Sequence, residues 1–235
     1  MVFFDKLMRW LKSLQRTDAS LGLPARSTLH INAIIVSHFD LDHYHGLTKV
    51  LTSDKFTVGR IYHNGLPRYG DNANKGLNLD SVTHHSDDTR SISTDFRGID
   101  STRQLVSSGL LFTDRGNDNK FSKFLQTAIK THDSGRFDDI DLLVKRKPDN
   151  SHPTLSNTGS DMTFEAPAPA ITKPSEAIRL PAFPDPHDVT DSNPQPTPSG
   201  SHTINGNSVV LWLIYGNTMF LFGDDLNQPA QAYLG

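Results

Sequence analysis

The chain has 235 residues, of which 35% are hydrophobic and 21% charged, so it is long enough to bury one sizeable core. Its 23 Lys and Arg against 26 Asp and Glu give a formal net charge of −3, which excludes a broad basic surface for nucleic acid but leaves room for local contacts. Because the chain has no cysteine, disulfide bonds and thiolate chemistry are excluded, and any metal site must use His and carboxylate ligands.

The first quarter of the chain carries clear hydrophobic patterns. Apolar residues at helical spacing predict an amphipathic helix over residues 3–16, which either packs on a sheet or lies on a membrane surface. Residues 31–37 form a short apolar run that is typical of a buried strand. A helix of two or three turns is expected around 47–51, followed by a second strand over 56–62. This strand, loop, helix, strand order favours the α/β class.

The middle of the chain is polar and rich in turn residues from about 70 to 200, and we interpret it as an insertion or elaborated loop region within a single domain over 1–235. Helical patterns occur around 121–130 and, more weakly, around 101–111. Prolines concentrate in 165–200, which predicts an extended, mobile linker.

Regular patterns return at residue 208. Two β-rich runs, 208–215 and 218–222, flank Gly216 and Asn217 and predict a hairpin. Asn227 and Pro229 then predict a last short helix.

Four side chains of metal-ligand type lie within six positions, directly after the first expected strand: His38, Asp40, Asp42 and His43. A strand end followed by a tight loop can turn His38 and Asp40 toward one cation, and Asp42 and His43 toward a second. Two cations roughly 3.5–4 Å apart can share a hydroxide and bind both oxygens of a hydrolysed ester. A capped helix start with solvated side chains is the alternative. A calcium-binding turn is a third interpretation, but the twelve-residue pattern with its Gly and terminal Glu is absent.

The segment Ser-His-Phe-Asp-Leu-Asp-His at 37–43 resembles the H-x-H-x-D-H signature of metallo-β-lactamase-fold hydrolases. It is most similar to the ComEC-type competence-protein branch, which has Asp in place of the second His. Asn205-Gly-Asn-Ser, Tyr215-Gly-Asn and Phe220-Leu-Phe-Gly-Asp resemble the strand, hairpin and Gly-Asp motifs of the same branch. The resemblance covers roughly residues 28–66 and 200–235.

The resemblance implies an αββα sandwich and a metal-dependent hydrolase that cleaves an ester or phosphodiester bond, with nucleic acid among the candidate substrates. It implies two divalent ions, zinc or manganese, held by His38, Asp40, Asp42, His43 and Asp224. Asp224 would bridge the metals, and Asp42 would orient the nucleophile. Asp225 is expected to be a solvated neighbour or a helix cap, and His63 and His202 are less favoured candidates for the site.

Several motifs of the branch are missing from this sequence. No D-x-G-x-G-D segment precedes His38, no His-His-Gly follows Asp224, and Asn207 and Ser208 stand where many relatives carry a third His. We therefore expect a sandwich that is truncated at both ends. The alternative function is a degenerate or truncated module that binds a metal or a partner without catalysis.

The sequence also bears on location. No apolar run reaches the roughly 18 residues needed to span a bilayer. Residues 1–15 lack the apolar segment and cleavage site of a signal peptide. We therefore expect no membrane span and a cytoplasmic protein.

Overall fold

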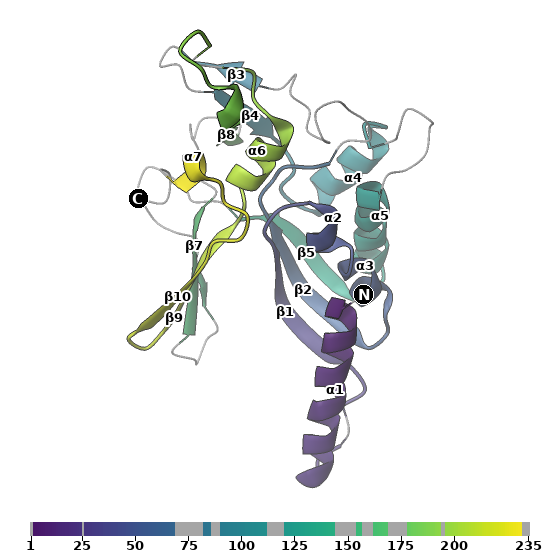
Figure 1. Cartoon of the computed structure of the whole chain (residues 1–235). Helices are drawn as coiled ribbons and strands as arrows, with labels where there is room; N and C mark the ends of the chain where they lie inside the picture. Colours follow the sequence, from purple (N-terminus) through teal and green to yellow (C-terminus); the bar gives the residue numbers. More distant parts are fainter. Residues whose placement is uncertain are drawn as a thin grey trace.

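The computed structural model describes residues 2–24, 26–68, 82–85, 90–111, 120–143, 154–156, 162–168, 178–193 and 196–231. Within the predicted insertion over 70–200, the expectations for the stretches between these ranges lie outside the described residues. The described part is a mixed α/β structure, as predicted at the level of fold class, with parallel and antiparallel sheets (Figure 1). The αββα sandwich stays a prediction.

A parallel sheet carries the core and the first candidate loop. Its strands are β1 (Leu29–Val36), β2 (Phe56–His63) and β5 (Phe137–Leu142), in the order β1-β2-β5. Helices α2 (Leu41–Tyr44) and α3 (Leu47–Thr52) connect β1 to β2. Because the strands are parallel, their carboxyl ends meet at one edge, where Val36 pairs with His63.

One face of this sheet is covered by helices (Figure 1). Alternation along the strands directs Ile34 and Ile61 into this core. Helices α4 (Ile99–Ser107) and α5 (Lys120–Asp133) supply much of its other side, and Phe124 of α5 is fully buried. Helix α1 (Val2–Ser20) also packs on this core through Leu11, so the apolar face of the amphipathic helix meets the core. No helix of the described residues is long and apolar enough to cross a bilayer.

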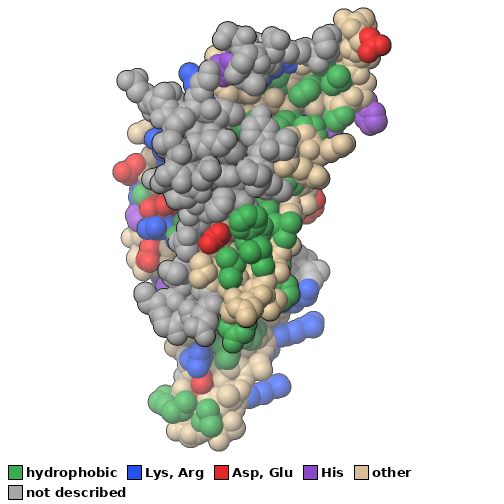
Figure 2. Space-filling model, turned by 90° about the vertical axis from the view of Figure 1, so that its left-hand side faces the viewer, with side chains coloured by type: hydrophobic (Ala, Val, Ile, Leu, Met, Phe, Trp, Pro, Cys, Tyr) green, Lys and Arg blue, Asp and Glu red, His purple; other side chains and the backbone are tan. Residues whose placement is uncertain are grey.

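The opposite face of the parallel sheet meets an antiparallel sheet. This second sheet has the order β10-β9-β7-β6, with strands β6 (Thr154–Ser156), β7 (Met162–Ala168), β9 (Val210–Tyr215) and β10 (Thr218–Phe222). The two sheets touch through Ile35 and Tyr62 on one side and Ala166 and Val209 on the other. The β9–β10 hairpin confirms the predicted turn, and hydrophobic side chains gather on the face of the molecule that carries this sheet (Figure 2).

A third, small sheet lies near the carboxyl edge of the parallel sheet (Figure 1). Its strands are β3 (Val82–His84), β4 (Arg90–Thr94) and β8 (Ile178–Pro181), in the order β3-β4-β8. Leu180 is fully buried against Ile92 and Ile204. The linker expected over 165–200 is therefore wrong for this stretch, because pairing with β4 and burial of an apolar side chain fix β8 in the fold.

Three short helical segments complete the described chain. A 3-10 turn (Pro186–Asp188) is followed by α6 (Gly200–Gly206) and α7 (Gln228–Gln231). Helix α7 confirms the last short helix, whereas α6 has no hydrophobic period that predicts it. α6 ends at Gly206 and β9 begins at Val210. The hairpin therefore begins two residues later than its expected start at 208.

Candidate metal centre

The candidate centre lies where the loop after β1 meets the segment after β10. The backbone N–H of Val209 donates to the Ser37 carbonyl at 2.9 Å, which joins the start of β9 to the end of β1. β9 leads away from this point and β10 leads back to it, so that Asp224, two residues after β10, lies near the end of β1. Asp224 thus reaches His38 although 186 positions separate them in the chain.

Three predicted ligands converge there: His38, His43 and Asp224 each offer one ligand atom within 4.8 Å of the others. Nδ1 of His38 lies 3.0 Å from Oδ2 of Asp224, and Nδ1 of His43 lies 3.7 Å from Oδ1. The two imidazole centroids are 4.0 Å apart. A tetrahedral cation with ligand bonds of about 2.0–2.2 Å holds its donor atoms roughly 3.3–3.6 Å apart, so the 3.7 Å pair nearly fits and the 3.0 Å pair would have to open slightly. Two nitrogens and one carboxylate are a suitable donor set for zinc or manganese.

The carboxyl group of Asp224 is held in its charged form. Burial raises its pKa, but hydrogen bonds with His38 and Ser37, together with the charges of the two histidines, lower the pKa well below its usual range. Its backbone has a φ of 48°, a left-handed conformation that Asp tolerates better than most residues. The turn after β10 therefore presents an ionised carboxylate to both rings.

Two serine hydroxyls lie on the Nδ1 side of the rings. Ser37 Oγ is 3.4 Å from Nδ1 of His38 and 3.2 Å from Nδ1 of His43. Ser208 Oγ is 3.2 Å from Nδ1 of His38. Ser208 thus reaches the centre from the position at which the sequence lacks a third His.

The other predicted ligands lie on the Nε2 side of the rings. Oδ2 of Asp40 is 3.6 Å from Nε2 of His38, and Oδ2 of Asp42 is 3.8 Å from Nε2 of His43. Asp42 has 84% of its side chain exposed. Neither residue belongs to the group of three that the structure brings together. Nε2 of His38 is buried and has no hydrogen-bond partner among the described residues, so this nitrogen can still bind a cation.

Asp225, expected as a solvated neighbour or a helix cap, lies beside the centre. Its Oδ2 lies 3.8 Å from Nε2 of His38 and 3.7 Å from Nε2 of His43, although about half of the side chain is exposed. Asp224 and Asp225 therefore approach the two rings from different nitrogens. The signal in the sequence is two consecutive Asp residues directly after a hairpin.

Two further histidines were candidates, and neither joins the group. His63 ends β2, is fully buried and stacks on Phe96 at a centroid distance of 4.1 Å. Its Nδ1 accepts the Gly65 N–H at 2.9 Å, and burial lowers its pKa to about 3, so it is a neutral core residue. Nε2 of His202 lies 3.3 Å from Oδ2 of Asp185, which is not one of the predicted ligands.

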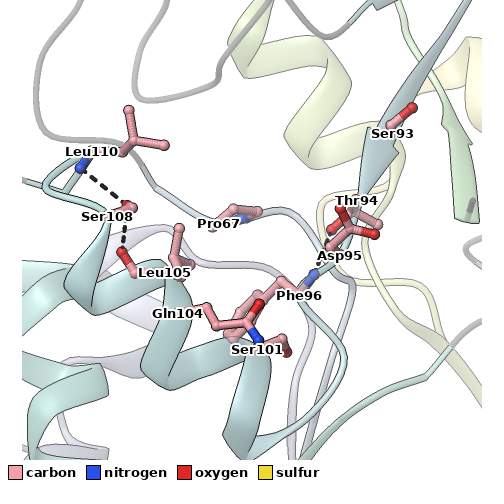
Figure 3. Close-up of a pocket in the computed structure, with 10 residues that line it drawn as sticks. All are labelled: Pro67, Ser93, Thr94, Asp95, Phe96, Ser101, Gln104, Leu105, Ser108 and Leu110. Carbon is pink, nitrogen blue, oxygen red and sulfur yellow. Dashed lines mark hydrogen bonds between the residues drawn. The ribbon is translucent and has the colours of Figure 1, made fainter.

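A pocket of about 340 Å³ opens next to this region, between α4, β4 and the segment after β2 (Figure 3). Phe96, Leu105 and Leu110 supply apolar walls, whereas the hydroxyls of Ser101 and Ser108 are engaged by backbone groups. None of the five predicted ligands lines the pocket. It adjoins the centre only indirectly, because the Phe96 ring packs 5.8 Å from that of Phe39, which follows His38.

Comparison of the chain with models of known families, with curated proteins and with solved structures finds no match. The resemblance to metallo-β-lactamase-fold hydrolases therefore rests on the motif residues alone and stays a prediction.

Proposed function

We propose that this protein is a metal-dependent hydrolase that cleaves an ester or phosphodiester bond, with nucleic acid among the candidate substrates. The observation that carries the proposal is the convergence of His38, His43 and Asp224 from two distant parts of the chain. Nε2 of His38 supports it: this buried atom has no hydrogen-bond partner among the described residues, and carboxylate oxygens of Asp40 and Asp225 lie 3.6 and 3.8 Å away, as around a cation.

The residues have separate roles in this proposal. Divalent zinc or manganese, when bound, supplies the Lewis acidity that activates water at neutral pH. Asp224 is ionised and faces one histidine with each oxygen, so together with His38 and His43 it would hold a cation. The exposed carboxylate of Asp42, beside His43, orients the nucleophilic water.

A second candidate function is a degenerate module that binds a metal or a partner without turnover. One observation favours it: only three of the five predicted ligands form the group that the structure brings together, and Asp42 is 84% exposed. Metal binding without hydrolysis would distinguish this module from the enzyme.

The test is metal stoichiometry by elemental analysis on chelator-stripped protein offered Zn²⁺ or Mn²⁺, followed by hydrolysis of bis(p-nitrophenyl) phosphate. We expect one or two bound ions in the wild type and their loss in His38→Ala and Asp224→Asn. Asp225→Asn should weaken binding, because it removes a charge beside both rings. Circular dichroism checks that each variant is folded.

Asp42→Ala has a matched control in Asp54→Ala, because both side chains are 84% exposed and only Asp42 lies beside a histidine of the centre. We expect Asp42→Ala to lower hydrolysis and Asp54→Ala to leave it unchanged. A wild type that binds no specific metal would refute the proposal, as would hydrolysis that survives both His38→Ala and Asp224→Asn.

A further inference from the structure

Arg68 connects the loop after β2 to the loop that carries the candidate ligands. Only 18% of its side chain is exposed. Its Nε donates to the backbone carbonyl of Phe39 at 3.0 Å, and its Nη2 pairs with Oδ1 of Asp40. The guanidinium group therefore contacts two consecutive residues directly after His38.

The local structure around Gly65 brings Arg68 to this position. The loop leaves β2 at the sheet edge where β1 also ends, since Val36 pairs with His63. Gly65 has a φ of +84°, and a Cβ there would lie 2.6 Å from Cδ1 of Leu142, so the turn needs glycine. The side chain of Asn64 accepts the Leu66 N–H at 3.2 Å and fixes the next step.

The electrostatics of Arg68 favour a fixed pair with Asp40. Burial lowers the pKa of Arg68 to about 10, which leaves the guanidinium charged at neutral pH. A charge largely removed from water is costly unless it is paired and hydrogen-bonded. A planar guanidinium with several fixed donors can hold a carboxylate and a carbonyl at once, which an ammonium group does less well.

Holding one oxygen of Asp40 determines where the other oxygen lies. While Oδ1 is paired with Arg68, Oδ2 is 3.6 Å from Nε2 of His38. That nitrogen is buried and has no hydrogen-bond partner among the described residues. The Arg68 contact thus places a carboxylate oxygen beside an imidazole nitrogen that can still bind a cation.

We propose that Arg68 is a positioning residue of the metal centre: it orients Asp40 so that Oδ2 stands beside Nε2 of His38, and this raises the affinity of the centre for a divalent cation. The inference rests on the proposed function, because it presumes that the centre binds metal. Arg68 acts through Asp40 and is not itself a ligand.

The substitution must separate orientation from charge, because removal of a positive charge would by itself favour cation binding. Arg68→Lys keeps the charge but loses the planar set of donors, so a weaker affinity in this variant reports lost orientation. Arg136→Lys is a matched control, since Arg136 also donates to a backbone carbonyl, that of Ser53 at 2.8 Å, but contacts none of the candidate ligands in the described structure.

The experiment is calorimetric titration of Mn²⁺ into chelator-stripped full-length protein, with the thermal midpoint of each metal-free variant measured alongside. We expect Arg68→Lys to weaken Mn²⁺ binding by about 10- to 100-fold, as is typical when a residue that orients a ligand is changed. Asp40→Asn should cause a similar loss. The double variant should lose little more than Asp40→Asn alone, because both changes act on the same carboxylate.

Each outcome decides the inference. Arg68→Lys binding within about twofold of wild type would overturn it, and so would a fully additive loss in the double variant, which would show that Arg68 acts independently of Asp40. A loss of the same size in Arg136→Lys would also overturn it. A wild type that binds no cation is a different result, because it removes the proposed function itself.

Discussion

His38 and His63 illustrate how the surroundings of a residue set its chemistry. Both side chains are fully buried at the ends of neighbouring parallel strands: His38 lies two residues after β1, and His63 is the last residue of β2. His38 is surrounded by carboxylates and serine hydroxyls, whereas the ring contacts of His63 are with Phe39 and Phe96. The first environment suits a cation, and the second suits a neutral ring.

His63 should make the stability of the protein depend on pH. In the unfolded chain a histidine has a pKa of about 6.5, whereas burial lowers the pKa of His63 to about 3 in the native state. The unfolded chain therefore binds a proton that the native state does not bind. The contribution of His63 to the free energy of unfolding is fully present above pH 6.5 and is lost as pH falls toward 3. The loss is about 1.4 kcal/mol for each pH unit across this window.

The measurement compares the free energy of unfolding in urea between pH 7 and pH 4.5 for wild type and His63→Gln. Gln keeps an acceptor for the Gly65 N–H but does not titrate, so we expect a smaller pH dependence in this variant. His187→Gln, at an exposed histidine, should behave like wild type. Equal pH dependence in wild type and His63→Gln would contradict the prediction.

Among the elements, those with a strong local pattern were predictable from the sequence. β1 has a continuous apolar run, α5 has a helical period, and the β9–β10 hairpin has two β-rich runs around a Gly-Asn turn. The observed bounds of these elements and of β2 differ from the expected ones by a few residues. β8 was missed because a four-residue strand in a proline-rich segment has little pattern of its own. Its pairing with β4 depends on residues more than 80 positions away, such as Ser91 with Pro181.

Gly59 fixes the approach of β1 and β2. A Cβ at this position would lie 2.5 Å from the backbone oxygen of Asn32 on the neighbouring strand. Backbone atoms cannot yield as a flexible side chain can, so Gly59→Ala should push the strands apart and destabilise the protein by roughly 1–3 kcal/mol. The midpoint of urea unfolding measures this effect.

Gly223→Ala is the control for this substitution, because a Cβ there meets no atom within 4 Å. It should leave the midpoint nearly unchanged. An equal midpoint for Gly59→Ala and wild type would show that the two strands have more freedom than the structure gives them.

In the whole molecule, the candidate centre depends on contacts between sheets. The local motif at 38–43 and the Asp after the hairpin were visible in the sequence, and the structure brings His38, His43 and Asp224 together. Arg68 was missed, because its role arises from which loops meet at the edge of the parallel sheet. No spacing in the chain indicates that a turn after β2 will reach Asp40.

The surface of the second sheet leads to the last prediction. β10 is at the end of the strand order, and Met219, Phe220, Leu221 and Phe222 are each 51–58% exposed. No described strand pairs with its outer edge, and it carries no charged residue. An apolar, uncharged edge strand of this kind favours association between chains.

Leu221→Lys should therefore reduce association that depends on protein concentration, because a charge at an edge strand disfavours pairing with another chain. Light scattering and sedimentation velocity over a series of concentrations measure the effect, and larger species should appear only at higher concentration than in wild type. Leu21→Lys is a matched control, since Leu21 is 67% exposed but lies beyond the end of α1 and not on a strand. If both variants reduce association equally, general surface hydrophobicity and not the β10 edge is responsible.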